Sequence, residues 1–214
     1  MQLILADDLA LVREKYIEVI EYTKDMNIHA RWIYGQHPTD TLIQSYIDRQ
    51  EMYLYMDGKN IAGMTAVTMY QGADYHEIGW SQNLNDDEVA SLHILAVTPE
   101  YQGKSVSKRM MEAILSLAME NRKKAIRLDT LASNIPAQHM YEKLGFTYRG
   151  KQNLYAENTG WTDFLYYELP LNHEILMKPC RHKTLEERAA EFGGQLDLDG
   201  EYDWGEQMGR EVWE

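Results

Sequence analysis

The part of the sequence best suited to chemistry is a short loop with one glycine and two serines, residues 102–107, which joins an apolar run to an amphipathic one. The apolar run, residues 92–97, predicts a strand that ends before Pro99, because proline cannot continue a strand ladder. From Val106 onward, apolar residues recur at helical spacing. A loop that leads into a helix offers free backbone N–H groups and the positive end of the helix dipole, which suits a pyrophosphate. Every helix has such an end, so the loop alone does not establish a phosphate site.

The elements around this loop predict an α+β domain built on a mixed, mostly antiparallel sheet flanked by helices. Capping residues and helical spacing predict helices in residues 9–23, 40–47, 106–122 and 136–143, and Gly145 stops the last one. Apolar runs bounded by turns predict strands in residues 52–56, 61–69, 88–97, 125–131, 146–148 and 162–169. The two strands that flank the third helix form a β-α-β crossover and are therefore parallel. Residues 77–80 fit neither pattern.

Length and composition limit the classes of protein to which the chain can belong. With 214 residues it can bury a core of its own without disulfides. The single cysteine, Cys180, excludes an intramolecular disulfide framework and a cysteine-based zinc cage, and no metal is expected. No stretch reaches the roughly 20 apolar residues that cross a bilayer, and residues 1–8 lack the features of a signal peptide, so we expect a cytoplasmic protein with no membrane partner. A formal net charge of −13 argues against nucleic acid as the main ligand.

Several short motifs in residues 92–150 follow one another in a defined order. The first is a strand end and proline that lead into the loop: Leu95-Ala96-Val97-Thr98-Pro99, then Gln102-Gly103-Lys104. The second follows the next strand, which contains Leu128-Asp129-Thr130, and consists of Asn134, Ala137 and Tyr141-Glu142-Lys143-Leu144-Gly145-Phe146. In order and spacing, this series resembles the GCN5-related N-acetyltransferase (GNAT) superfamily.

The resemblance implies the GNAT fold and an enzyme that moves an acetyl group from acetyl-CoA directly to a primary amine of a small molecule or peptide. It places the pyrophosphate on the backbone amides of the loop and the pantetheine along the strand end, where one N–H stabilises the thioester oxyanion. It assigns Asn134 to the CoA arm and makes Tyr141 the general acid for the departing thiolate. The cofactor-binding residues that it implies are Leu95, Ala96, Val97, Gln102, Gly103, Lys104, Ser105, Val106, Ser107, Asn134, Ala137 and Tyr141.

One departure from the family pattern lies in the loop itself. Ser105 and Ser107 occupy positions where the family prefers glycine or alanine. Glycine there lets the backbone approach phosphate closely and adopt φ values that other residues avoid. Serine adds a Cβ atom, although its hydroxyl can cap the helix or donate to a phosphate oxygen. Two alternatives follow: retained CoA binding, or a GNAT-fold scaffold with little or no catalysis.

The acceptor side requires a group that takes a proton from the amine. His93 titrates near neutral pH and lies four residues before Val97, so strand alternation places both side chains on one face. The alternative for His93 is a half-buried strand histidine with a structural role. Glu77 and Glu88 are further candidates for the base. Aromatic residues that could line an acceptor cleft are Trp32, Tyr34, Tyr70 and Trp80. The acidic composition favours a cationic acceptor such as a polyamine, an aminoglycoside or lysine.

The C-terminal residues differ in composition from the rest. Residues 185–214 hold ten acidic side chains against two arginines, which is −8 of the net −13. We therefore expect a GNAT domain in residues 1–170, a linker in 171–184 and an interaction tail in 185–214. The motifs Asp203-Trp204-Gly205-Glu206 and Gly209-Arg210-Glu211-Val212-Trp213 resemble the acidic tail of MazE-type antitoxins, which implies a protein partner such as a ribonuclease toxin. The alternative is a tail that folds back on its own domain or on a neighbouring subunit of a homodimer.

Overall fold

The structure, a computed structural model, describes residues 1–171 and contains one seven-stranded sheet. The strand order is β1-β2-β3-β4-β5-β7-β6, and β4 and β5 pair in parallel while the other neighbours are antiparallel. The strands are β1 (Gln2–Leu5), β2 (Met52–Asp57), β3 (Asn60–Thr68), β4 (Val89–Val97), β5 (Ala125–Leu131), β6 (Thr147–Ala156) and β7 (Gly160–Pro170).

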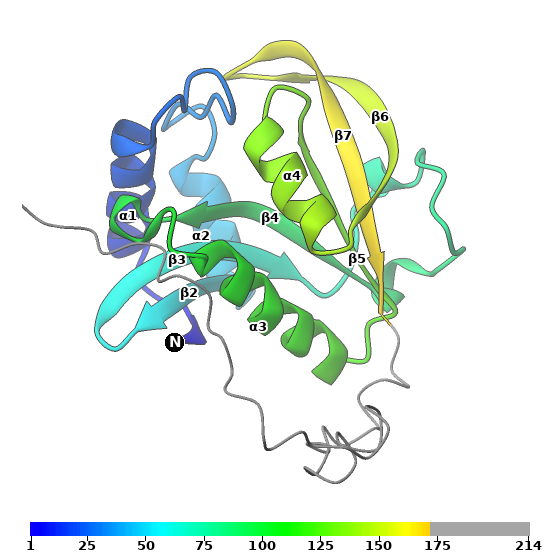
Figure 1. The fold of residues 1–214 in the computed structure, drawn as a ribbon, viewed down its shortest axis with the longest axis horizontal. Coiled ribbons are helices and arrows are strands. Elements are labelled where there is room, and N and C mark those ends of the chain that lie inside the picture. The colour runs from blue at the N-terminus through cyan, green and yellow to red at the C-terminus, as the bar shows by residue number, and fades with distance from the viewer. Residues whose placement is uncertain (172–214) are drawn as a thin grey trace, which may run out of the picture. The chain divides into compact units, whose positions relative to one another are not determined.

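Four α-helices lie against the sheet, two on each face (Figure 1). They are α1 (Leu9–Tyr22), α2 (Asp40–Asp48), α3 (Val106–Glu120) and α4 (Ile135–Lys143). Polar side chains fix where the first two begin: Asp8 accepts hydrogen bonds from the amides of Ala10 and Leu11, and Thr39 accepts one from the amide of Leu42. α3 is the crossover helix between the parallel strands, as the sequence predicts.

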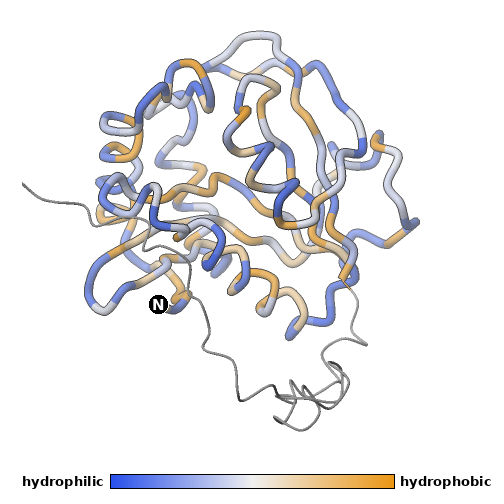
Figure 2. The backbone as a smooth tube through the Cα atoms, in the orientation of Figure 1, coloured by the Kyte–Doolittle hydropathy of each residue, from blue (hydrophilic) through white to orange (hydrophobic). Residues whose placement is uncertain are grey.

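The apolar side of each helix forms the core. Residues of α1 and α2 make one cluster on one face of the sheet, and residues of α3 and α4 belong to the cluster on the other face. Figure 2 shows hydrophobic residues concentrated along the central strands, with hydrophilic residues in the turns at the periphery. Burial of apolar surface on both faces is therefore the main force that holds the sheet in place.

The central feature of the sheet is the divergence of its two parallel strands. β4 and β5 pair only from Val89 to Leu92 and from Ala125 to Leu128. Beyond that point the β3–β4 register shifts at a β-bulge, and Ile94 adopts a φ of 44°, which is unusual for a β-branched residue. The Tyr16 hydroxyl donates to the Ile94 carbonyl at 2.7 Å and so holds the bulge. The strands consequently open between the ends of β4 and β5.

The expected α+β fold with a mixed sheet is confirmed, and three regions differ in detail. The sequence does not predict β1. β6 extends well beyond the predicted residues 146–148, because many of its exposed positions are polar and give little apolar signal, whereas β7 is close to the predicted 162–169. The segment 69–88 is irregular and contains two short 3-10 helices. In the described part of the chain, no helix is long and apolar enough to cross a membrane. The expected tail, its antitoxin resemblance and its partner fall on residues outside the described ones.

Candidate active site

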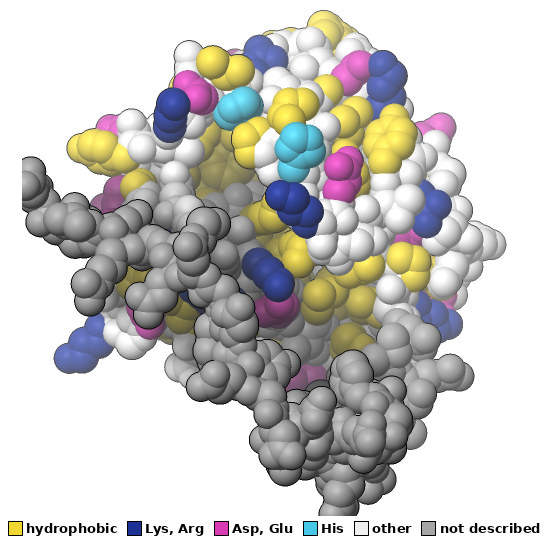
Figure 3. All heavy atoms as spheres, in the orientation of Figure 1, with side chains coloured by type: hydrophobic (Ala, Val, Ile, Leu, Met, Phe, Trp, Pro, Cys, Tyr) yellow, Lys and Arg dark blue, Asp and Glu magenta, His cyan; other side chains and the backbone are white. Residues whose placement is uncertain are grey.

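A cavity of about 410 Å³ occupies the opening between β4 and β5. Its walls come from both faces of the sheet, from the segment before α2 and from α4. Figure 3 shows the molecule hollowed between the α1 and α4 sides, with basic side chains beside the hollow. The residues that line the cavity are Trp32, His37, Leu42, Tyr46, Leu92, His93, Ile94, Leu95, Asp129, Thr130, Asn134, Ala137, Met140, Tyr141 and Phe164.

A neighbouring cavity of about 330 Å³ shares Trp32, Leu95 and Asn134 with the first one. It extends past Val97 to Gln102, at the start of the loop that leads into α3. The two cavities together connect the loop with the opening in the sheet. This arrangement provides space for a long ligand whose reactive end lies between β4 and β5.

The loop presents consecutive unpaired amides. The backbone N–H groups of residues 103–108 make no hydrogen bond to any residue in the described range 1–171. The Gln102 side chain donates to the Thr23 hydroxyl at 2.7 Å and to the Val97 carbonyl at 3.0 Å, and thereby ties the loop to α1 and β4. Free amides at the start of a fifteen-residue helix form an anion-binding geometry.

The two serines of the loop lie in different surroundings. Ser105 is the N-cap of α3 and adopts a left-handed conformation, with a φ of 56°, which is the kind of backbone that favours glycine. Its hydroxyl makes no capping hydrogen bond, so the capping role considered for it is not observed. Ser107 lies in the first turn of α3, after the buried Val106. The chain therefore tolerates a strained serine where a glycine would be relaxed.

Tyr141 and Asn134 lie on α4 and at its start. Tyr141 is 6% exposed, lines the cavity, and makes no hydrogen bond through its hydroxyl to the described part of the chain. Burial, with a further contribution from Asp129, raises the pKa of Tyr141 well above its ordinary value, so the phenol keeps its proton at neutral pH. Asn134 caps α4 by accepting from the Ala137 amide and lines both cavities.

Asp129 is the carboxylic acid among the cavity-lining residues of the described chain, and the sequence predicts no role for it. Its Oδ1 atom accepts a hydrogen bond of 2.7 Å from the Tyr75 hydroxyl. Burial raises the pKa of Asp129, whereas the neighbouring His93 and the bond from Tyr75 act in the opposite direction. A carboxylate within a largely buried strand is rare, and this was the signal in the sequence that could have pointed to it.

His93 lines the cavity on the same face of the sheet as α2, where its ring stacks on Tyr46 at 5.8 Å. Burial lowers the pKa of His93, so the imidazole is neutral at neutral pH. The expectation that His93 and Val97 share a face is wrong. Val97 packs in the cluster with α3, because the bulge at Ile94 interrupts the alternation between them.

The other acceptor-side candidates are distributed over the surface and the core. Glu88 pairs with Lys124, Glu77 is exposed, and neither lines the cavity. Of the four aromatic residues considered for the cleft, Trp32 lines the cavity, and the structure adds two that were not considered, Tyr46 and Phe164. Tyr34, Tyr70 and Trp80 lie elsewhere.

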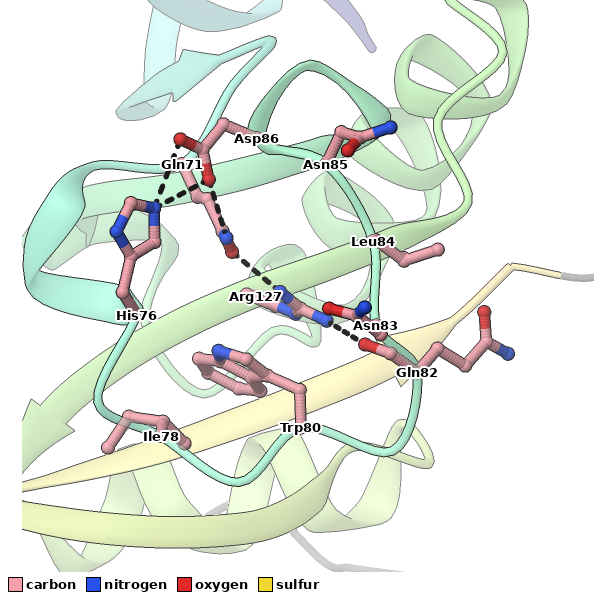
Figure 4. Close-up of a pocket in the computed structure, with 10 residues that line it drawn as sticks. All are labelled: Gln71, His76, Ile78, Trp80, Gln82, Asn83, Leu84, Asn85, Asp86 and Arg127. Atoms are coloured by element: carbon pink, nitrogen blue, oxygen red, sulfur yellow. Dashed lines mark hydrogen bonds and ion pairs between the residues drawn. The ribbon is translucent and has the colours of Figure 1, made fainter.

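A further cavity, of about 440 Å³, lies beside the buried Arg127 (Figure 4). The Arg127 guanidinium stacks over Trp80 at 4.3 Å and donates to the Gln71 side chain, the Gln82 carbonyl and Glu168. Figure 4 shows the segment that carries His76 to Asp86 curving around it. The lining residues include none from the loop at α3 or from the opening in the sheet. We interpret Arg127 as the anchor that fastens this segment to the sheet.

The rings of Trp80 and Tyr75 connect Arg127 to Asp129 in the active-site cavity. Trp80 stacks on Tyr75 at 5.8 Å with an interplanar angle of 15°, and Tyr75 is the residue that bonds Asp129. Tyr166 of β7 contacts the edge of Tyr75 at 5.3 Å. Tyr75 is therefore held on two sides, and its hydroxyl has a fixed direction toward the carboxylate.

Comparisons with known proteins agree with this architecture. A solved acetyltransferase structure, yncA from Salmonella typhimurium with its cofactor acetyl-CoA, superposes with a TM-score of 0.57 at 16% identity over 80% of this chain and 94% of that one. The N-acetylaspartate synthetase of Xenopus tropicalis is 37% identical over 65 residues, 30% of this chain and 24% of that protein.

A putative [ribosomal protein bS18]-alanine N-acetyltransferase of Bacillus subtilis is 31% identical over 70 residues, 32% of this chain and 46% of that protein. The matches to these two relatives therefore span less than half of each relative's own length. Residues 18–146 match the family described as the acetyltransferase (GNAT) family, whose members use acetyl-CoA as cosubstrate. Because this match covers more than half of the chain, the chain belongs to the acetyltransferase (GNAT) family.

Proposed function

We propose that the chain transfers an acetyl group from acetyl-CoA to a primary amine by direct transfer in a ternary complex. The observation that carries this proposal is the placement of Tyr141, Asp129 and His93 around one cavity, which adjoins the cavity that begins at the free amides of residues 103–108. A phenol that keeps its proton, a carboxyl group and a neutral imidazole thus surround the point where a thioester would lie.

The donor side fits acetyl-CoA in its chemistry. The unpaired amides before α3 suit the pyrophosphate, and Gln102 holds this loop against β4. From His93 onward β4 pairs with none of the described strands on its β5 side, so the strand edge formed by Leu95, Ala96 and Val97 is available to the pantetheine. An N–H of this edge would hold the carbonyl oxygen, and Asn134 lies where the arm passes. We place this catalytic domain in residues 1–170, since β7 ends at Pro170.

On the acceptor side, one residue binds the amine and another removes its proton. Acetyl-CoA supplies the acetyl group as an activated thioester. Asp129 binds the ammonium form of the acceptor, and His93, which burial keeps neutral, accepts the proton that makes the amine nucleophilic. Tyr141 donates its proton to the sulfur as the C–N bond forms and the C–S bond breaks. The second proton that the nitrogen loses on becoming an amide, and the one held by His93, leave to solvent through the cavity, and Tyr141 regains a proton by the same route.

Two measurements test this proposal. Calorimetry with CoA should give saturable binding to a single site, and thiol release from acetyl-CoA should depend on an added amine. The names of the two relatives point to different acceptors, aspartate for one and an alanine of a ribosomal protein for the other. The amines tested should therefore cover free amino acids, amino alcohols and peptides. Absence of CoA binding by the folded protein would contradict the proposal.

A further inference from the structure

We infer that the acceptor is a cationic amine whose neighbouring groups carry no negative charge, so that free α-amino acids are excluded. This inference rests on the proposed function and specifies the substrate class of the same site. It comes from the charge and enclosure of the cavity between β4 and β5.

Within residues 1–171, the cavity has one carboxylic acid and neither lysine nor arginine. Of its fifteen lining residues, all within the described part of the chain, Asp129 is the carboxylic acid, and none is a lysine or an arginine. Burial lowers the pKa values of His37 and His93, so both imidazoles are neutral near pH 7. Burial also raises the pKa values of Tyr46 and Tyr141, so both phenols are neutral as well. Burial raises the pKa of Asp129, while His93 and the hydrogen bond from Tyr75 favour its ionised form. In that form Asp129 is a charged partner for an ammonium group, whereas a carboxylate finds no cationic side chain among the described residues of the cavity.

The arginines around the cavity are committed to other groups. Arg49 pairs with Glu51 at 2.7 Å, and Arg127 is buried against Glu168. Arg31 donates to the Thr159 carbonyl and lines a separate cavity. No arginine of the described residues therefore lines the cavity to neutralise an acidic acceptor.

The geometry of an α-amino acid brings its carboxylate into the same space as its amine. The two groups share one carbon, so an amine at Asp129 would carry the carboxylate into the cavity with it. There the carboxylate would face Asp129 among neutral polar and apolar side chains, with no lysine or arginine of the described chain to balance its charge. Like charges that meet away from water repel strongly, and an unpaired carboxylate loses its hydration. An amine beside a hydroxyl, an amide or an alkyl carbon meets neither obstacle.

Matched pairs of acceptors test this directly. L-Alaninol and L-alanine, and L-leucinol and L-leucine, differ at the carboxylate and have amines of similar basicity. We expect kcat/KM for each alcohol to exceed that for its amino acid by at least about 100-fold at neutral pH. Asp129→Asn should lower kcat/KM for the alcohols and reduce this preference to below about tenfold. Glu77→Gln, which removes an exposed acid outside the cavity, should leave the preference unchanged.

The outcomes separate the inference from the function on which it rests. If the protein binds CoA and acetylates amines, but kcat/KM for each amino acid equals or exceeds that for its alcohol, the inference is overturned and the acetyltransferase proposal stays intact. An unchanged preference in Asp129→Asn would also overturn it, because the discrimination would then arise elsewhere. Failure to bind CoA, or bound CoA without acetylation of any amine, would overturn the proposed function and the inference together.

Discussion

The Tyr75 hydroxyl donates a hydrogen bond of 2.7 Å to Oδ1 of Asp129, and so a residue of the irregular segment before β4 determines how the carboxylate of the cavity is held. Tyr75 is buried and stacked between its neighbours, which fixes the direction of this bond. The bond stabilises the ionised form of Asp129 and so lowers its pKa, whereas burial disfavours that form and raises the pKa.

Removal of this bond should appear in the pH dependence of the reaction. In Tyr75→Phe the pKa of Asp129 should rise, because burial still raises it and a bond that lowers it is lost. The acid limb of kcat/KM should therefore move to higher pH, and kcat/KM at neutral pH should fall roughly tenfold, the value of one hydrogen bond to a charged group. Steady-state rates across pH measure both. Tyr166→Phe, which loses a bond to Gln152 instead, is the control and should keep the acid limb in place; an equal shift in both variants would argue for a general packing effect.

Tyr141→Phe should separate chemistry from binding. We expect kcat to fall by about 10²–10⁴-fold, the usual contribution of a positioned acid, while the Kd for CoA stays within twofold of wild type. Calorimetry and thiol-release rates provide the two numbers. Tyr155→Phe, at an exposed position on β6, is the matched control and should change neither. A full rate in Tyr141→Phe would show that the thiolate leaves without help from this phenol.

Two substitutions at Ser105 distinguish its hydroxyl from its backbone conformation. Ser105→Ala keeps the Cβ atom at a φ of 56° and removes the hydroxyl, so CoA should bind about fivefold more weakly if that hydroxyl donates to a phosphate. Ser105→Gly relaxes the left-handed backbone and should bind CoA within about threefold of wild type. Calorimetric titrations of the three proteins give the comparison. Identical affinities would mean that the serine hydroxyl makes no contact with CoA.

The buried ion cluster on β5 and β7 should dominate stability rather than activity. Glu168 lies between Arg127 at 2.9 Å and Arg149 at 3.0 Å, so Glu168→Gln leaves two partly or fully buried cations without their counter-charge. We expect a loss of about 3–5 kcal/mol in the free energy of unfolding, measured by denaturant titration at pH 7. Asp163→Asn, which breaks the exposed pair with Lys151, should cost less than about 1 kcal/mol.

The same variant has a defined pH dependence. Burial by itself would raise the pKa of Glu168, yet the hydrogen bonds from Ser81 and Arg127 lower it overall. A carboxylate whose pKa is lower in the folded state stabilises the fold above its ordinary pKa and loses this contribution as pH falls through the folded value. The difference between wild type and Glu168→Gln should therefore shrink in acid. A difference that stays constant down to low pH would exclude Glu168 as the titrating group.

The sequence could predict the features of the site that depend on local spacing. The loop before α3 follows from the spacing of the strand end and the helix start, whereas Asn134 and Tyr141 follow from the resemblance to the GNAT superfamily. In the structure Gln102 of the loop, Asn134 and Tyr141 line adjoining cavities. The roles of these residues in binding and catalysis remain predictions. The spacing of residues predicts where the strand ends and the helix begins, because both are determined by the nearest few residues.

What spacing could not predict depends on tertiary contacts. Tyr75 and Asp129 are 54 residues apart. The irregular segment is held at β5 by the stack of Arg127 on Trp80 and by the hydrogen bonds from Arg127 to Gln71 and Gln82. The bulge at Ile94 likewise has no clear signature in an apolar run, and a shift of one residue was enough to put Val97 on the opposite face from His93. Register within a buried strand is decided by its neighbours.

The divergence of β4 and β5 has a consequence for how such a protein can change over time. Main-chain geometry makes the gap, through the bulge at Ile94 and the Tyr16 hydroxyl that bonds its carbonyl, so the position of the gap does not depend on most of the side chains around it. The residues that line the cavity come from separate segments of the chain, so the sequence of one segment can change while the others stay the same. One scaffold can thus come to accept different substrates through changes in these segments, while the gap between the strands stays in place.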